Sequence, residues 1–408
     1  MTGMRRVPGL VVCLGLSAAM PAYADAVTDW NARTITCSAN RPSVQGLLDV
    51  ALIQAAVHDA IQAIQGRFEA YRYTNPSRLG VGSPSAATAA ASYRMLVTFY
   101  GAGNACMSGA VNPELTYPGD AGLQAGYEAA AVLIPLYRPF FVLPTDPFLG
   151  GTDPGEWRPT PGVTQGVNTF LAKTEPFTLL RPSQFRPEPP DPLTSMSYAR
   201  DYQEVKDYGR ASSTVRTPEQ TDMARFWTAF GPQWFGAVRA IATAHVPDIG
   251  DTARLLALCA LVAADSQITV YDTKYYYNFW RPYTAIREGD NDGNPNTIGD
   301  PTWTPFLATP PYPDHTSGAN NITGGITTVL ELFFGTDDFE FSVSSPNAGL
   351  TTNPRQFHHF SDAAQEVVDV RILQGIHFRK ADELGRIQGS RVAHWAFQKF
   401  LRPLPGTH

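Results

Sequence analysis

The sequence predicts an all-α protein: one large helical-bundle domain with long proline-rich loops. Apolar residues recur at helical spacing in most segments, while alternating strand patterns are scarce and no repeat with a fixed period is present. Hydrophobic residues make up 43% of the chain and charged residues only 17%, which is enough for a large core. The segments before and after the proline-rich stretch each look too small to close an active site alone. We therefore expect one domain over residues 25–408.

The first 24 residues resemble a secretory signal peptide. Arg5 and Arg6 precede a short apolar stretch over residues 7–19, and Ala22-Tyr23-Ala24 has the small-x-small pattern of a cleavage site. The alternative is a membrane anchor, but a spanning helix needs about 20 apolar residues and this stretch is shorter. We expect cleavage before Asp25, a periplasmic or secreted location and no insertion into the membrane.

Helical periodicity locates the elements of the predicted domain. The predicted helices cover residues 43–64, 85–100, 122–136, 218–230, 232–244, 249–277, 316–334, 361–376 and 380–400. Between residues 141 and 193, proline and glycine recur every few positions, which predicts a long ordered loop. Its composition differs from that of a Gly/Ser linker, so it does not indicate a boundary between two domains.

The net charge limits the classes of binding partner, and the cysteine count limits the number of disulfides. The net charge is −6 without a basic cluster, which argues against a nucleic-acid partner because phosphate backbones require grouped Lys and Arg. Cys37, Cys106 and Cys259 remain after cleavage, so one internal disulfide and one free thiol can form in an oxidising compartment. The sequence leaves open which two cysteines pair, and also whether the chain forms a homo-oligomer.

Two polar patches in the C-terminal half suggest an anion site. In the first, Lys274 and Arg281 lie seven residues apart, which on one helix is about two turns and the same face. The second, over residues 310–320, precedes a predicted helix that Thr316 or Ser317 would cap. Free amides and the helix dipole make such an N-terminus a natural anion site. Each patch alone also fits a structural role, as solvated cations or an ordinary helix cap.

A third patch supplies a histidine. Arg371 and His377 lie six residues apart. In a cationic pocket, a neutral imidazole is able to attack phosphorus or to bind the metal of an oxyanion. Taken alone, a histidine of this kind is more often structural.

In this order, the three patches resemble the signature of the superfamily shared by vanadium-dependent haloperoxidases and type 2 phosphatidic acid phosphatases. The matching residues are Lys274, Arg281, Pro282, Ser317, Gly318, Arg371 and His377. Segments 28–31, 183–187 and 216–221 also look like bacterial haloperoxidase homologues. The resemblance therefore covers most of the mature chain, with the oxyanion site inside residues 270–385.

The resemblance implies a role for each matched residue. The three cations would neutralise the oxygens of a bound vanadate, or of phosphate as an alternative occupant. Ser317 and the Gly318 amide would donate hydrogen bonds to it. His377 would bind the vanadium atom or attack phosphorus.

Three positions depart from the family pattern. Ala319 stands where the second motif has a histidine, Val370 replaces a serine, and the residue four beyond the third-motif histidine is Ala381. Losing a general acid typically lowers a rate by about 10² to 10⁴. Two hypotheses follow: His315 takes over the proton transfer from the opposite side of its loop, and Asp382 orients the third-motif histidine.

The expected function is that of an exported vanadium-dependent haloperoxidase. Hydrogen peroxide, a halide and a small organic acceptor would be its substrates, and vanadate its cofactor. We expect His377, Lys274 and His315 to carry the catalysis. Two alternatives stay open: a vanadate-inhibited phosphatase of soluble phosphomonoesters, and an oxyanion binder that has lost turnover because of Ala319.

Overall fold

The computed structural model confirms the all-α prediction. It describes residues 25–137 and 147–406, and within these ranges the regular structure is helical apart from one two-stranded antiparallel hairpin and isolated bridges. The predicted signal peptide, residues 1–24, lies outside the described residues, as do residues 141–146 of the predicted loop. The described rest of that loop, residues 147–193, contains short 3₁₀ turns and isolated bridges but no α-helix or strand.

Helices follow one another along almost the whole chain. The first elements are α1 (Ala26–Ser38), α2 (Ser43–Gln65), α3 (Pro84–Tyr100), α4 (Pro113–Thr116), α5 (Gly122–Leu133), α6 (Met196–Tyr208) and α7 (Pro218–Phe226). They are followed by α8 (Phe230–His245), α9 (Ile249–Tyr277), α10 (Pro282–Arg287), α11 (Gly318–Phe334), β1 (Asp338–Val343), β2 (Arg355–His359), α12 (Phe360–Leu373) and α13 (Arg379–Lys399).

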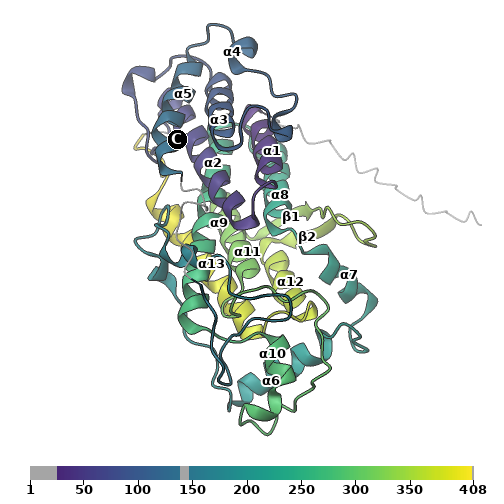
Figure 1. Cartoon of the computed structure of the whole chain (residues 1–408). Coiled ribbons are helices and arrows are strands. Elements are labelled where there is room, and N and C mark those ends of the chain that lie inside the picture. Colours follow the sequence, from purple (N-terminus) through teal and green to yellow (C-terminus); the bar gives the residue numbers. More distant parts are fainter. Residues whose placement is uncertain (1–24, 138–146, 407–408) are drawn as a thin grey trace, which may run out of the picture.

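The helices form an elongated bundle with α9 inside it. Helices α1, α2, α3 and α5 gather at one end, α6 and α10 lie at the other, and α9, α11 and α13 lie between them (Figure 1). One continuous hydrophobic cluster includes side chains from the early helices and from α9, α11 and α13. The chain then returns to the first end, where Phe68 and Pro403 form an antiparallel bridge. The N-terminal and C-terminal helices therefore share one core.

Helix α9 shows why the sequence folds in this way. Its apolar residues surround it on every side, as expected of a helix at the centre of a large core, and it is almost wholly buried from Gly250 to Lys274. The side chain of Asp248 caps its first turn, accepting from the amides of Gly250 and Asp251. At the other end, Asn278 adopts a left-handed conformation with φ of 49° and ends the helix.

Several elements differ from the sequence predictions. The helix predicted over residues 218–230 ends at Phe226, because the chain turns at Trp227 before α8 begins. Helices α1, α4, α6 and α10 and the β1–β2 hairpin were not predicted. In β1 the apolar residues Phe339, Phe341 and Val343 alternate with polar ones and pack toward the core, but strands of six and five residues give too short a pattern to stand out from the helical segments around them.

Among the helices in the described part of the chain, α2 and α9 are long and apolar enough to cross a membrane by length and composition alone. Their apolar windows are fully buried inside the protein. Packing within the bundle therefore accounts for their hydrophobicity.

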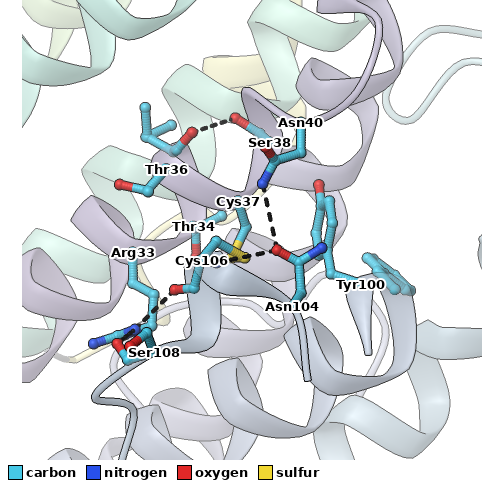
Figure 2. Close-up of a disulfide and its surroundings, with 12 residues drawn as sticks. Arg33, Thr34, Thr36, Cys37, Ser38, Asn40, Tyr100, Asn104, Cys106 and Ser108 are labelled. Carbon is cyan, nitrogen blue, oxygen red and sulfur yellow. Dashed lines mark hydrogen bonds between the residues drawn. A yellow bond between two sulfur atoms is a disulfide. The ribbon is translucent and has the colours of Figure 1, made fainter. Parts of the chain in front are cut away.

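A disulfide joins Cys37, near the end of α1, to Cys106 in the 3₁₀ turn η2 (Ala105–Met107) (Figure 2). Nearby, Arg33 donates to the carbonyl oxygens of Cys106 and Ser108 at 2.9 and 3.0 Å. This resolves the pairing that the sequence left open, and Cys259 is a buried free thiol. The bridge fixes the C-terminal end of α1, immediately before the turn into α2.

Replacing both bridged cysteines, Cys37→Ser with Cys106→Ser, should lower the free energy of unfolding by about 4 kcal/mol. The bridge spans 69 residues of sequence, and closing such a loop restricts the unfolded chain by about this amount. Denaturant unfolding monitored by circular dichroism measures the change. A reductant should lower the wild-type stability to that of the double variant without affecting the variant itself. Equal stability of both proteins in oxidising buffer would contradict the assignment.

Candidate functional site

Lys274 and Arg281 are brought together by two different elements. Lys274 lies in the last turn of α9, whereas Arg281 is the N-cap of α10. The expectation that both lie on one helix face was wrong, because α9 ends at Tyr277 and the chain reverses at Asn278. Both cations nevertheless lie about 5 Å from the ring centroid of Tyr312, at 5.1 and 5.0 Å. They are almost completely buried.

The second patch supplies carbonyl groups that hold both cations. Lys274 Nζ donates to the carbonyl oxygens of Pro313 and Asp314 at 3.0 and 2.8 Å. Arg281 donates from Nε to the carbonyl oxygen of Tyr312 at 2.8 Å. The segment over residues 312–314 is therefore fixed by the two cations of the first patch.

His377 lies between Arg281 and the carboxyl group of Asp314. Arg281 Nη1 is 3.1 Å from His377 Nε2 and 2.7 Å from the carbonyl oxygen of Ile376, to which it donates. His377 Nδ1 is 2.8 Å from Asp314 Oδ1. A proton between Nδ1 and Oδ1 makes such a short contact favourable, and it leaves the lone pair of Nε2 as the basic position of the ring.

Arg371 completes the cationic cluster from α12. It donates to the side chain of Gln374, and Gln374 in turn donates to the carbonyl oxygens of Ala224 and Trp227 at 2.8 Å each. This chain of bonds ties α12 to the turn between α7 and α8. Burial lowers the pKa of Arg371 to about 10, so it remains charged at neutral pH.

The N-terminus of α11 faces the same cluster. Ser317 is its N-cap but makes no side-chain capping bond, and the helix begins at Gly318. The Ser317 hydroxyl accepts from Asn320 Nδ2 at 3.2 Å, and the same amide group donates to Asp382 Oδ1 at 2.8 Å. Asp382 therefore anchors the start of α11 to α13.

A cavity of about 430 Å³ opens onto this cluster. We call it the central cavity; residues of α1, α2, α8, α9 and α11 line it, together with Tyr312, Arg371 and His377. Gly318 and Ala319 form part of its inner wall. Lys274 and Arg281 are almost completely buried and are not among the residues that line the cavity.

Burial and the mutual repulsion of the cations shape the electrostatics of the site. Burial, followed by the charge of Arg281, holds the pKa of Lys274 well below its usual value. The same causes hold the pKa of His377 well below its usual value, so its imidazole is neutral at pH 7. Burial also raises the pKa of Asp314 to about 7 and that of Asp382 well above its usual range. The carboxyl groups therefore neutralise only part of the cationic charge.

Two sequence hypotheses about supporting residues do not match the geometry. His315 lines a different, smaller pocket, and its Nε2 lies 2.9 Å from the carbonyl oxygen of Glu188. Burial lowers its pKa to about 4. The structure thus does not bring His315 to the central cavity beside Ala319. Asp382 contacts Asn320, whereas the carboxyl group beside His377 is that of Asp314.

Asp314 and Gln267 belong to the site but were not predicted from the sequence. Asp314 stands inside the second patch, where a carboxyl group among prolines gave no periodic signal. Gln267 lines the central cavity from α9 and donates to the carbonyl oxygen of Gly318 at 3.3 Å. Its signal was its position, two turns before Lys274 in an otherwise apolar helix.

The donor set fits a tetrahedral oxyanion such as vanadate or phosphate. Within the described part of the chain, Arg281 Nη2 and Arg371 Nε are buried donors without a hydrogen-bond partner. Unpaired buried donors cost free energy, and an anion with several oxygens would satisfy them. A bound anion would also raise the pKa of Lys274 and favour its charged form. Lys274, Arg281, Arg371 and the Gly318 amide would hold the oxygens, with His377 as the ligand to the central atom.

Comparisons with known sequences point to one group of enzymes. A family model described as the VCPO second helical-bundle domain matches residues 254–406. Vanadium chloroperoxidase from Curvularia inaequalis is 25% identical over 281 residues, which cover 56% of this chain and 45% of that protein. The match thus spans just under half the length of the fungal enzyme.

Solved structures show the same fold over nearly the whole chain. A bacterial vanadium-dependent iodoperoxidase superposes with a TM-score of 0.77 at 23% identity, covering 94% of this chain and 98% of that one. An apo-type bacterial vanadium-dependent chloroperoxidase superposes with a TM-score of 0.68 at 15% identity, covering 86% and 92%. The fold is therefore that of the vanadium haloperoxidases, and the resemblance expected from the sequence is confirmed.

Replacing Arg371 with glutamine should weaken the binding of inorganic phosphate by about 10- to 100-fold. The change removes a charged donor from the central cavity, and hydrogen bonds to charged groups contribute about 1.5–3 kcal/mol. Isothermal titration calorimetry measures the affinity. Arg379→Gln is the matched control, because Arg379 is paired with Glu204 and Asp369 and is not among the residues lining the central cavity. Similar losses in both variants would show that overall charge, not this site, binds the anion.

Proposed function

We propose that the protein is a vanadium-dependent haloperoxidase that oxidises a halide with hydrogen peroxide. The observation that carries this proposal is the cluster of Lys274, Arg281 and Arg371 around a neutral His377 at the inner end of the central cavity. The fold shared with vanadium haloperoxidases supports it.

The chain's own residues would perform two tasks. The cations and the start of α11 bind and orient the oxyanion, since they present charge and amide donors in fixed positions. Asp314 contacts the His377 ring at Nδ1 and Arg281 Nη1 contacts it at Nε2, so the two groups together orient the imidazole. Vanadate, when bound, would supply the Lewis acidity that activates hydrogen peroxide toward a halide.

Ala319 sets the expected rate of this enzyme. It lines the central cavity at the position where the family signature has a histidine, and no described histidine other than His377 lines that cavity. Proton transfer to peroxide would then depend on water or on the bound oxyanion. We therefore expect slow turnover compared with an enzyme that has the motif histidine.

The proposal includes an exported protein. The signal pattern over residues 1–24 and the Cys37–Cys106 disulfide support it, because disulfides persist in oxidising compartments.

Purified mature protein should oxidise bromide or iodide with hydrogen peroxide only after addition of orthovanadate. Bromination of monochlorodimedone measures the activity, and His377→Ala should abolish it because the ligand to the central atom is lost. His394→Ala, on the exposed face of α13, should match the wild type. Hydrolysis of p-nitrophenyl phosphate without any bromination would instead favour a phosphatase.

Restoring the motif histidine by Ala319→His should raise kcat for halide oxidation by about 10² or more. The new imidazole would enter the central cavity beside the oxyanion and return a general acid and base to it. Steady-state kinetics at saturating peroxide measure the change. Thr228→His adds the same side chain at the exposed mouth of the cavity and should have little effect. An unchanged or lower kcat in Ala319→His would rule out the loss of this histidine as the limiting defect.

A further inference from the structure

The central cavity extends well beyond the oxyanion cluster. Its volume of about 430 Å³ lies in the range of pockets that enclose drug-sized organic molecules, whereas an oxyanion, a peroxide and a halide are far smaller. Arg371 and His377 mark its inner end. Ala39 and Thr228, which are exposed, mark its mouth.

The wall between these two ends combines apolar and polar surface in similar amounts, and its apolar part comes from several helices. Leu47 and Val50 of α2 face it from one side, and Phe235 of α8 and Ile322 of α11 complete it. Each of these four side chains is buried within the fold. A ligand in this space would bury apolar surface against several helices at once, which favours binding.

The charges at the wall select the kind of ligand. Among the described residues that line the central cavity, the charged side chains are Arg41 and Arg371, and none is acidic. A positively charged ligand would therefore be disfavoured, whereas a hydroxyl group that can ionise would be tolerated or attracted. Gln267 and Tyr312 add hydrogen-bonding groups near the inner end.

We propose that the central cavity binds the organic acceptor, a small aromatic molecule with an acidic hydroxyl group, such as a phenol or naphthol. This inference rests on the proposed function and deepens it. Halogenation would then occur inside the protein, next to the oxyanion site. Halide, hydrogen peroxide, one proton and the aromatic C–H compound would give the C–halogen product and two molecules of water, with peroxide reduced and the halide oxidised by two electrons.

Gly231 offers a way to fill the cavity without disturbing a packed core. It lies in the first turn of α8, and a Cβ atom built there would meet only Leu47 Cδ2, at an ordinary contact distance of 3.6 Å. A larger side chain would extend toward Leu47 across the cavity. Leucine is also a better helix former than glycine by about 0.8 kcal/mol, so Gly231→Leu should fold.

Gly236 gives a matched control on the same helix. A Cβ atom there would meet nothing within 4 Å, and the residue does not line the central cavity. Gly236→Leu therefore makes the same chemical change outside the proposed site.

The first experiment measures binding of 2-naphthol by fluorescence titration, without peroxide or vanadate. We expect Gly231→Leu to weaken the affinity at least tenfold and Gly236→Leu to match the wild type. The cation 1-naphthylmethylammonium should bind the wild type at least tenfold more weakly than 2-naphthol. Equal naphthol affinity in all three proteins, or equal affinity for the cation, would overturn the proposal.

The second experiment compares halogenation of 2-naphthol with oxidation of iodide to triiodide in the presence of vanadate. In Gly231→Leu the KM for 2-naphthol should rise at least tenfold, and the ratio of naphthol halogenation to triiodide formation should fall. An unchanged ratio would show that halogenation takes place in free solution. If no protein oxidises iodide, the proposed function fails, while the binding experiment still decides whether the cavity accepts naphthol.

Discussion

The burial of three positive charges in one cluster is the constraint on which the rest of the site depends. Lys274 and Arg281 lie almost wholly out of contact with water and Arg371 is half-buried beside them, so their mutual repulsion opposes folding. Backbone carbonyl groups offset part of that cost, because the loop over residues 312–314 directs its oxygen atoms at the first two cations. The loop conformation, the start of α11 and the orientation of His377 all follow from this arrangement.

The N-terminal helices are as necessary to the site as the segment that carries its polar residues. The family model covers residues 254–406, which contain the cationic cluster, but α1 and α2 supply one side of the central cavity. The disulfide at Cys37 fixes the end of α1 where that side begins. The residues of the cationic cluster and the residues that form one side of the cavity leading to it thus come from different parts of the chain.

The sequence predicted the fold well where one physical signal dominated. Helix α9 was predicted with its observed bounds. The long, mostly apolar segment between Asp248 and Asn278 is too long for a strand, so helix is the secondary structure it predicts. The end of α7 was placed too late because the turn at Trp227 is held by tertiary hydrogen bonds, such as that from Gln374 to the Trp227 carbonyl oxygen. Short periodic patterns cannot register such long-range contacts.

For the site, motif spacing brought together the cations and His377 but misjudged how they meet. Two turns of helix were expected between Lys274 and Arg281, whereas a chain reversal joins them. The role of Asp314 depends on a contact with His377, which lies in a distant segment of the chain, and no local pattern encodes such a contact.

The unpaired donors of Arg281 and Arg371 have a consequence for the whole molecule. An anion that binds only the folded chain stabilises it by mass action, by about 2.7 kcal/mol at a concentration 100 times its dissociation constant. The residues that hold the anion come from α9, α10, α11 and α12, so they assemble only when these helices have docked. Inorganic phosphate or vanadate in the surrounding medium would thus stabilise the fully docked bundle relative to partly docked forms.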